Sequence, residues 1–150
     1  LHCWLDSAWA HQAMACLQGL DTPVRVAANP LSGHAFRWLR RAQRQALKLV
    51  QYSSSFLYGP PGTGKTTTLG VLLAEYLHMN PRARVLLLST TNHAVDQATV
   101  AVDKALEQSK REALRKTIKR LGSRFGASHY VGREHMLPVH AERLTKQLAD

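Results

Sequence analysis

The sequence predicts an α/β protein built on a parallel sheet, and three observations support this fold class. Residues 85–88 form a continuous apolar run, as expected of a strand buried on both faces. A second, shorter apolar run covers residues 56–58. Each run leads through a polar loop into a segment with helical periodicity, an order typical of parallel strands joined by right-handed crossovers. Ligands bind such sheets where the strands end, so we expect the two loops to share one edge.

Composition favours a globular domain that binds a polyanion. The chain has 150 residues, 45% of them hydrophobic, which is enough to bury one core. Its 20 Lys and Arg residues oppose 10 Asp and Glu residues, and the formal charge of +10 favours nucleic acid as a partner, although a solubilising surface is the alternative. Cys3 and Cys16 are too few for a disulfide framework, and the first residues lack the pattern of a signal peptide or membrane anchor. We therefore expect a cytoplasmic protein, or a nuclear one in a eukaryote.

Residues 1–30 are expected to form an N-terminal helical or linker segment. Apolar residues recur at helical spacing over residues 4–17, and residues 24–26 suit either a strand or a linker. Turn-forming residues then mark a boundary at the end of this segment. Residues 35–51 predict a helix, because an apolar stripe runs along one face while arginine side chains occupy the others.

Residues 31–150 are expected to form the N-terminal part of one α/β domain. A helix is predicted over residues 65–78, where an Asn-Pro pair ends it. A longer helix is predicted over residues 94–116, and residues 117–121 predict a further strand. The predicted strands and helices therefore alternate along the domain, as in a parallel α/β sheet.

The loop between the first predicted strand and its helix has the sequence of a phosphate-binding loop. A triphosphate needs a concave set of amide donors, and glycines let the backbone turn so that successive amides converge on it at the start of a helix. The residues expected to bind the nucleotide are Gly59, Pro60, Pro61, Gly62, Thr63, Gly64, Lys65, Thr66 and Thr67. Lys65 is expected to bridge the β- and γ-phosphates, and the Thr66 hydroxyl to ligate Mg²⁺. We therefore expect ATP with Mg²⁺ as the ligand, and these two residues as the catalytic candidates.

Residues 59–69 have the sequence GPPGTGKTTTL, and residues 86–98 have the sequence LLLSTTNHAVDQA. Together these two segments resemble superfamily 1 helicases of the group that contains the nonsense-mediated decay helicase. In that group the second segment is motif Ia, with a pattern near S-N-x-A-V-D, and here Thr91 stands where serine is common. The resemblance implies the first RecA-like domain of a P-loop NTPase, and single-stranded DNA or RNA as its partner. It also implies nucleic-acid contacts from Thr91, Asn92 and His93.

Motif Ia also has a physical interpretation that does not depend on the family. Small hydroxyl and amide groups at a helix N-terminus can contact phosphates and position a strand without identifying its bases. A helix N-cap and nothing more is the alternative, because threonine and asparagine suit that position well.

A third segment resembles the part of these helicases that recognises adenine. Residues 43–47, QRQAL, match the group's Q-x-x-A-[VL] pattern, which implies that Gln43 contacts the base. An amide side chain can donate to and accept from the adenine edge at once, which makes glutamine chemically suitable. The alternative is a solvated glutamine on a helix, since Gln45 lies only two residues away.

Part of the machinery for ATP hydrolysis has no counterpart in the sequence. Phosphoryl transfer to water also needs acidic residues for the magnesium shell and the attacking water, and usually an arginine. No apolar run ending in Asp-Glu follows Thr66, and the nearest candidate, residues 100–103, falls inside a predicted helix. The resemblance thus stops before Walker B, the arginine finger and the second RecA-like domain. We expect the chain alone to be inactive in hydrolysis and to need the remainder of a helicase or a partner chain.

Two alternatives remain open. An AAA+ type ATPase has the same phosphate loop, although its acidic motif follows more closely and it would not explain residues 91–96. A non-catalytic remnant that binds ATP and nucleic acid is the other. Its binding face would consist of Lys104, Lys110, Arg111, Arg115, Lys116, Lys119, Arg120 and Arg124, unless these pair with the interleaved acidic residues.

Overall fold

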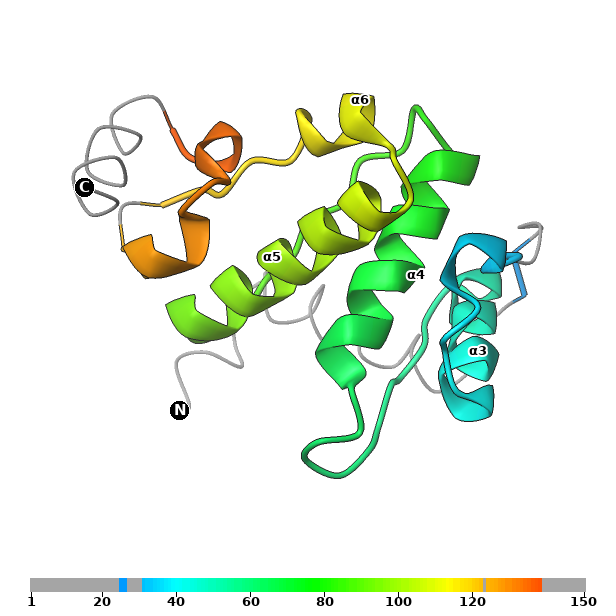
Figure 1. Ribbon diagram of the computed structural model, residues 1–150. Helices are drawn as coiled ribbons and strands as arrows, with labels where there is room; N and C mark the ends of the chain where they lie inside the picture. Colours follow the sequence, from blue (N-terminus) through cyan, green and yellow to red (C-terminus); the bar gives the residue numbers. More distant parts are fainter. Residues whose placement is uncertain (1–24, 27–30, 123, 139–150) are drawn as a thin grey trace, which may run out of the picture.

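The computed structural model of the protein describes residues 25–26, 31–122 and 124–138, and its described part is mostly helical (Figure 1). The predicted helix at residues 4–17 lies outside the described residues. The α-helices are α3 (Arg41–Ala46), α4 (Lys65–Met79), α5 (Asn92–Gln108) and α6 (Glu112–Arg115). Short 3₁₀ helices are η1 (His34–Phe36), η2 (Leu47–Gln51), η3 (Ala127–Tyr130) and η4 (Glu134–Met136). The helix predicted over residues 65–78 is confirmed as α4, one residue longer than expected.

Helices α4 and α5 pack against each other at the centre of the molecule (Figure 1). Gly70 of α4 lies at this contact and lets the two helices approach closely. A Cβ atom added at Gly70 would lie 2.6 Å from the carbonyl oxygen of Ala101, closer than real Cβ contacts. Apolar side chains of both helices form the main core around this point, joined by residues 31–39. The fully buried or nearly buried members are Phe36, Leu39, Leu47, Val71, Ala74, Val102, Ala105 and Leu106.

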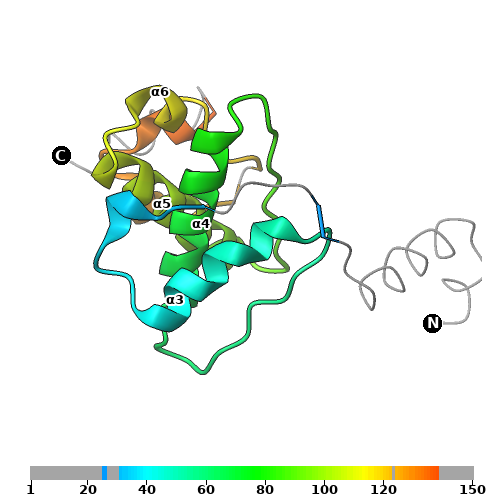
Figure 2. The same cartoon turned by 90° about the vertical axis from the view of Figure 1, so that its right-hand side faces the viewer.

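The segment before the phosphate loop packs on α4 as an outer layer, with α3 crossing in front of α4 (Figure 2). Glu75, buried on α4, accepts a hydrogen bond from the Gly33 amide at 3.2 Å and so fixes where this layer begins. The single helix predicted over residues 35–51 is wrong, because the chain turns and extends between η1 and α3. The Arg44 guanidinium donates to the carbonyl oxygens of Arg37 and Leu39, which a continuous helix would need for its own amides.

The long helix predicted over residues 94–116 is also wrong in its extent. Helix α5 begins two residues earlier, at Asn92, and ends at Gln108, where Lys110 adopts a left-handed conformation with φ of 56°. The amides of Lys110 and Arg111 donate to the carbonyls of Glu107 and Leu106, which is the Schellman pattern of helix termination. No glycine marks this position, and Arg111, directly after the turn, reaches across to α4 and pairs with Glu75 at 2.6 Å.

The chain after α6 packs on α5 through a second, smaller apolar cluster. Tyr130, Met136 and Leu137 are buried there, and Val100, Ile118 and Phe125 pack against them. One backbone hydrogen bond, from the Arg120 amide to the Met136 carbonyl at 2.7 Å, joins the two arms of this segment. The amides of Thr117 and Ile118 donate to carbonyls of α6, so residues 117–121, predicted as a strand, pair with the other arm at one point and form no ladder.

The predicted parallel sheet is not formed within the described ranges. The β pairing there is one isolated antiparallel bridge between Arg25 and Tyr52, which falls in the segment predicted as strand or linker. Residues 56–58 and 85–88 pass through the structure without ladder hydrogen bonds. Leu87 packs on the main core, whereas Val85, Leu86 and Leu88 are exposed. The physical reason for the correction is that a strand exists only through pairing, and no described segment lies in register beside these runs.

None of the helices in residues 25–26, 31–122 and 124–138 has the length and apolar character that crossing a bilayer requires.

Candidate nucleotide and nucleic-acid sites

The phosphate loop turns sharply into the first residue of α4. Gly62 and Gly64 have φ angles of 78° and 80°, left-handed values that residues with a Cβ atom rarely adopt. Helix α4 starts at Lys65, and within the described residues the amides of Lys65, Thr66 and Thr67 have no hydrogen-bond acceptor. These unsatisfied donors sit at the positive end of a 15-residue helix. The loop therefore has the open amides that binding an anion at a helix N-terminus requires.

The Lys65 side chain folds back over the loop instead of pointing to solvent. Its Nζ atom donates to the carbonyl oxygens of Gly59 at 2.6 Å and Pro60 at 2.8 Å. The Thr63 hydroxyl also donates to Pro60 at 2.8 Å, so the loop is held in shape by its own polar groups. If the Lys65 ammonium bound a phosphate group instead, the carbonyls of Gly59 and Pro60 would lose these two hydrogen bonds.

Three consecutive threonines at the start of α4 have different surroundings. Thr66 and Thr67 are exposed, whereas Thr68 is buried and its hydroxyl donates to the Gly64 carbonyl at 2.9 Å. Thr68 thus stabilises the helix start, and the Thr66 hydroxyl remains accessible to a ligand. The fit to ATP with Mg²⁺ rests on this hydroxyl, the open amides and the free space beside Gly62, where an added Cβ would meet nothing within 4 Å.

Gln43 lies against the phosphate loop although it is distant in sequence. Its Nε2 atom is 3.5 Å from the Thr63 carbonyl, at the limit of a hydrogen bond, and a Cβ added at Gly64 would lie 2.8 Å from the same atom. Its Oε1 atom accepts a hydrogen bond from the Arg40 amide at 2.9 Å, which caps α3. The structure thus brings the predicted adenine contact to the nucleotide loop, with both ends of its amide engaged by the protein.

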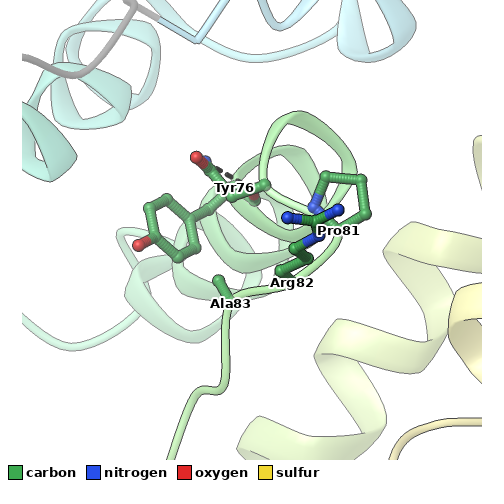
Figure 3. Close-up of a pocket in the computed structure, with 5 residues that line it drawn as sticks. Tyr76, Pro81, Arg82 and Ala83 are labelled. Carbon is green, nitrogen blue, oxygen red and sulfur yellow. Dashed lines mark hydrogen bonds between the residues drawn. The ribbon is translucent and has the colours of Figure 1, made fainter.

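A hollow at the far end of α4 does not belong to this site. Its walls are Tyr76, Asn80, Pro81, Arg82 and Ala83, where Asn80 ends the helix by donating to the Tyr76 carbonyl at 3.0 Å (Figure 3). Helix α4 separates it from the phosphate loop by about 20 Å, at a rise of about 1.5 Å per residue. The nucleotide site is therefore defined by the loop and not by this hollow.

The three motif Ia residues lie at the start of α5, and each has a different partner. Thr91 is the N-cap, because its Oγ1 atom accepts a hydrogen bond from the Ala94 amide at 3.3 Å, so capping accounts for this hydroxyl. Asn92 is the first residue of the helix and is exposed. His93 is exposed, lies 2.9 Å from the Gln97 amide nitrogen and places its ring 5.4 Å from the ring of His129. Helices α4 and α5 both begin toward the lower side of the view in Figure 1.

A buried charge pair, which the sequence interpretation did not assign, lies directly under the motif Ia residues. Asp96 on α5 and Arg120 are 1% and 5% exposed, and the Arg120 Nε atom donates to Asp96 Oδ1 at 2.7 Å. Tyr130 and the Gly126 amide also donate to this carboxylate, each at 2.8 Å. Burial disfavours the charged carboxylate, but these bonds from Arg120, Gly126 and Tyr130 outweigh it, so the pKa of Asp96 lies below its usual value.

Arg120 also reaches the exposed residues beside the pair. Its Nη2 atom donates to Asn92 Oδ1 and to the Arg124 carbonyl, both at 3.0 Å, and Nη1 donates to the Leu121 carbonyl. No local sequence pattern singles out Arg120 for this role, because its partners Asp96 and Asn92 lie 24 and 28 positions away.

A second buried carboxylate, Asp103, organises the opposite end of α5. It is fully buried and lies 2.9 Å from Arg115, 3.0 Å from Arg133 and 3.1 Å from His135. Burial raises the pKa of Asp103, but the hydrogen bonds and positive charge of Arg115 and His135 prevail and hold that pKa below its usual value. Asp103 lies on a helix and takes part in ion pairs, which agrees with the interpretation that residues 100–103 are not a Walker B motif.

These ion pairs remove three residues from the predicted basic face. Arg111, Arg115 and Arg120 pair with Glu75, Asp103 and Asp96 and are largely buried. Pairing with the interleaved acidic residues was the alternative interpretation of this basic stretch. It is confirmed for Arg115, whereas Arg111 and Arg120 pair with acidic residues that lie before the stretch, on α4 and in the first half of α5. The exposed remainder of the face is Lys104, Lys110, Lys116, Lys119 and Arg124.

Comparisons with known proteins agree with the motifs. Residues 39–148 match a protein family described as AAA domain. DNA polymerase alpha-associated DNA helicase A of Saccharomyces cerevisiae is 37% identical over 59 residues, which cover 39% of this chain and 9% of that protein. Putative regulator of nonsense transcripts 1 of Takifugu rubripes is 39% identical over 83 residues, 55% of this chain and 7% of that protein. No solved structure matches the chain.

The chain thus spans less than a tenth of the length of these curated relatives. The family match covers most of the chain and includes the phosphate loop, the motif Ia residues and the buried pair beneath them. The chain therefore belongs to this family of AAA domains, and its resemblance to superfamily 1 helicases of the group containing the nonsense-mediated decay helicase is confirmed.

Proposed function

We propose that this chain is the ATP-binding part of an ATP-dependent DNA or RNA helicase, and that it binds MgATP and the backbone of a single strand at separate helix N-termini. The observation that carries the proposal is the phosphate loop. Its glycines take left-handed conformations, and the amides of Lys65, Thr66 and Thr67 have no acceptor in the described part of the chain. A triphosphate supplies the acceptors that these amides lack.

Binding of the nucleotide would exchange hydrogen bonds within the loop for bonds to phosphate. The Lys65 ammonium would leave the carbonyls of Gly59 and Pro60 and bridge two phosphate groups as a point charge. The exposed Thr66 hydroxyl would ligate Mg²⁺, which neutralises charge on the phosphates when bound. Gln43, beside Gly64, would turn its amide from the loop to the adenine edge.

The proposed nucleic-acid contact uses the start of α5 and stays independent of base sequence. Asn92 and His93 are exposed there, and their polar groups suit phosphate oxygens at the positive end of the helix. Lys119 and Arg124 are exposed in the adjoining segment and add positive charge to it. Affinity for single strands is therefore expected to fall steeply with salt.

We also propose that the apolar runs belong to a parallel RecA-like sheet, which the remainder of a helicase or a partner chain would complete. Leu86 and Leu88 are 69% and 82% exposed, and Phe56 and Tyr58 are as exposed as Leu88, although apolar runs of this kind suit buried strands. A groove of about 550 Å³ runs beside residues 85–89, between α4, α5 and residues 117–121. The remainder of a helicase, or a partner chain, would pair with these runs and supply the acidic motif and arginine finger that hydrolysis needs.

The phosphate-loop assignment is tested by Lys65→Ala, with Lys104→Ala on the exposed face of α5 as a control of equal charge. Binding of a fluorescent ATP analogue in the presence of Mg²⁺ is the measurement. We expect Lys65→Ala to weaken binding by about tenfold or more, because a central charge-assisted contact to phosphate is lost. We expect Lys104→Ala to bind as the original chain does. If Lys65→Ala bound the analogue as tightly as Lys104→Ala does, the phosphate-loop assignment would be wrong.

A further inference from the structure

We infer that Arg120 is a positioning residue for nucleic-acid binding, which turns the amide nitrogen of Asn92 outward to donate to a backbone phosphate. This inference rests on the proposed function, since it names how the motif Ia contact is prepared. The observation behind it is one arginine that joins a buried carboxylate, Asp96, to an exposed amide, Asn92.

The chemistry of arginine decides which atom of Asn92 faces inward. A guanidinium has donors and no acceptor, so the Asn92 atom 3.0 Å from Arg120 Nη2 must be the carbonyl oxygen. The NH₂ group is then the other in-plane branch of the amide, on an exposed side chain and without a partner among the described residues. Orientation of this amide is therefore fixed by bonding and does not depend on how oxygen and nitrogen were distinguished.

Arg120 can fix the amide because it is itself held on every side. It is 5% exposed, it donates Nε to Asp96, and its remaining donors reach the carbonyls of Leu121 and Arg124. Asp96 in turn accepts from Tyr130 and from the Gly126 amide. The guanidinium therefore cannot swing to solvent without leaving a buried carboxylate without its ion-pair partner, which is strongly unfavourable.

The orientation matters because phosphate oxygens accept hydrogen bonds and do not donate them. An Asn92 that presents its nitrogen donates to phosphate, whereas one that presents its oxygen repels it. Without Arg120 the amide would rotate between both states and pay an ordering cost when the strand binds. The buried pair of Asp96 and Arg120 thus orients the exposed amide of Asn92 through the guanidinium of Arg120.

The variant Arg120→Lys separates two roles of the arginine, which are pairing with Asp96 and holding the amide of Asn92. A lysine ammonium keeps the charge beside Asp96 but is a point donor that cannot also hold Asn92. Tyr130→Phe is the matched control, because it removes a different hydrogen bond from the same buried carboxylate and does not touch Asn92. The probe is a short labelled oligouridylate, and the readouts for the full chain are its affinity, the affinity for a fluorescent ATP analogue and the melting temperature.

We expect Arg120→Lys to weaken oligouridylate binding by about tenfold, as for loss of an oriented hydrogen bond to a charged group. Tyr130→Phe should leave this affinity unchanged while lowering the melting temperature, and neither variant should alter ATP affinity. In an Asn92→Ala background, Arg120→Lys should have no further effect on oligouridylate binding, because the group on which it acts is gone.

Other outcomes overturn the inference in distinguishable ways. If Asn92→Ala weakens binding but Arg120→Lys does not, or if the two effects add, the contact stands and the positioning role is wrong. If Asn92→Ala binds oligouridylate as the original chain does, the proposed motif Ia contact fails and the inference with it. Should Arg120→Lys fail to fold, NMR of the unmodified chain decides: oligouridylate must shift the side-chain NH₂ resonances of Asn92, and unshifted resonances would count against the inference.

Discussion

Gln43 has two possible roles that the structure brings close together. Its amide lies beside Thr63 and Gly64 of the phosphate loop and also caps α3 through the Arg40 amide. It could support the loop, or it could contact adenine as the resemblance implies. These roles differ in which part of the nucleotide they affect.

The two roles of Gln43 are separated by comparing ATP with inorganic triphosphate as ligands. If Gln43 contacts the base, Gln43→Ala should weaken ATP binding by roughly fivefold to tenfold, the effect of losing one or two neutral hydrogen bonds. Triphosphate binding should then stay unchanged, because triphosphate has no base. Gln45→Ala, an exposed neighbour, is the control and should alter neither ligand. Equal loss for both ligands in Gln43→Ala would assign the residue to the loop.

At the residue level, the sequence predicted chemistry that depends on spacing and could not predict chemistry that depends on packing. The phosphate loop is contiguous, so its glycines and Lys65 could be recognised directly. The pair of Asp96 and Arg120 joins residues 24 positions apart, and the Asp103 cluster reaches 32 positions to His135. No local pattern marks such partners, because they meet only when the segment after α6 folds back on α5.

At the level of elements, the crossing of α4 and α5 depends on the absence of a side chain at Gly70. Glycine to alanine inside an exposed helix usually stabilises it by about 1 kcal/mol. At Gly70 the sign should reverse, because the added Cβ would lie 2.6 Å from the Ala101 carbonyl oxygen and 2.7 Å from its carbonyl carbon. Backbone atoms cannot rotate away as a flexible side chain would, so the helices must separate.

We therefore expect Gly70→Ala to lower the free energy of unfolding by about 1–3 kcal/mol, the range for overpacked cores. Urea denaturation of the full chain measures it. His78→Ala, an exposed position on the same helix, should change stability by less than about 0.5 kcal/mol. A Gly70→Ala variant more stable than the original chain would mean that α4 and α5 do not approach this closely.

Element boundaries were predicted well where local chemistry sets them and poorly where distant contacts do. Helix α4 starts at the phosphate loop and stops before Pro81, and both signals are local. Helix α5 stops at Gln108 without a glycine or proline signal, and Arg111, just beyond this end, contacts Glu75 on α4, 36 residues away. The predicted strands at residues 56–58 and 85–88 have the right composition, but a strand also needs a neighbour, and composition does not supply one.

At the scale of the whole molecule, the charge of the chain divides into a buried set and an exposed set. The formal charge of +10 suggested a broad basic surface. Several arginines instead hold the segment after α5 to the helices, through Glu75, Asp96 and Asp103. These carboxylates are buried, so the tertiary structure should depend on their ionisation.

That dependence gives a prediction for stability against pH. The pKa values of Asp96 and Asp103 both lie below the usual 3.8 in the folded chain, because bonds to arginine outweigh burial. On acidification the unfolded chain therefore takes up protons first, and stability falls as pH falls. The full contribution of the two pairs should be present above pH 3.8 and be lost progressively below it, as pH drops through the lowered pKa values.

Urea denaturation midpoints measured from neutral pH downward test this expectation. The original chain should keep a nearly constant contribution from the two pairs at neutral pH and lose it steeply in acid. Asp96→Asn should be less stable at neutral pH, by about 3–5 kcal/mol for a broken buried pair, and should show a shallower acid loss. Glu112→Gln, which removes an exposed carboxylate that also contacts Arg115, should keep the original profile. Identical slopes for Asp96→Asn and the original chain would show that Asp96 does not couple folding to pH, and that other groups unfold the protein in acid.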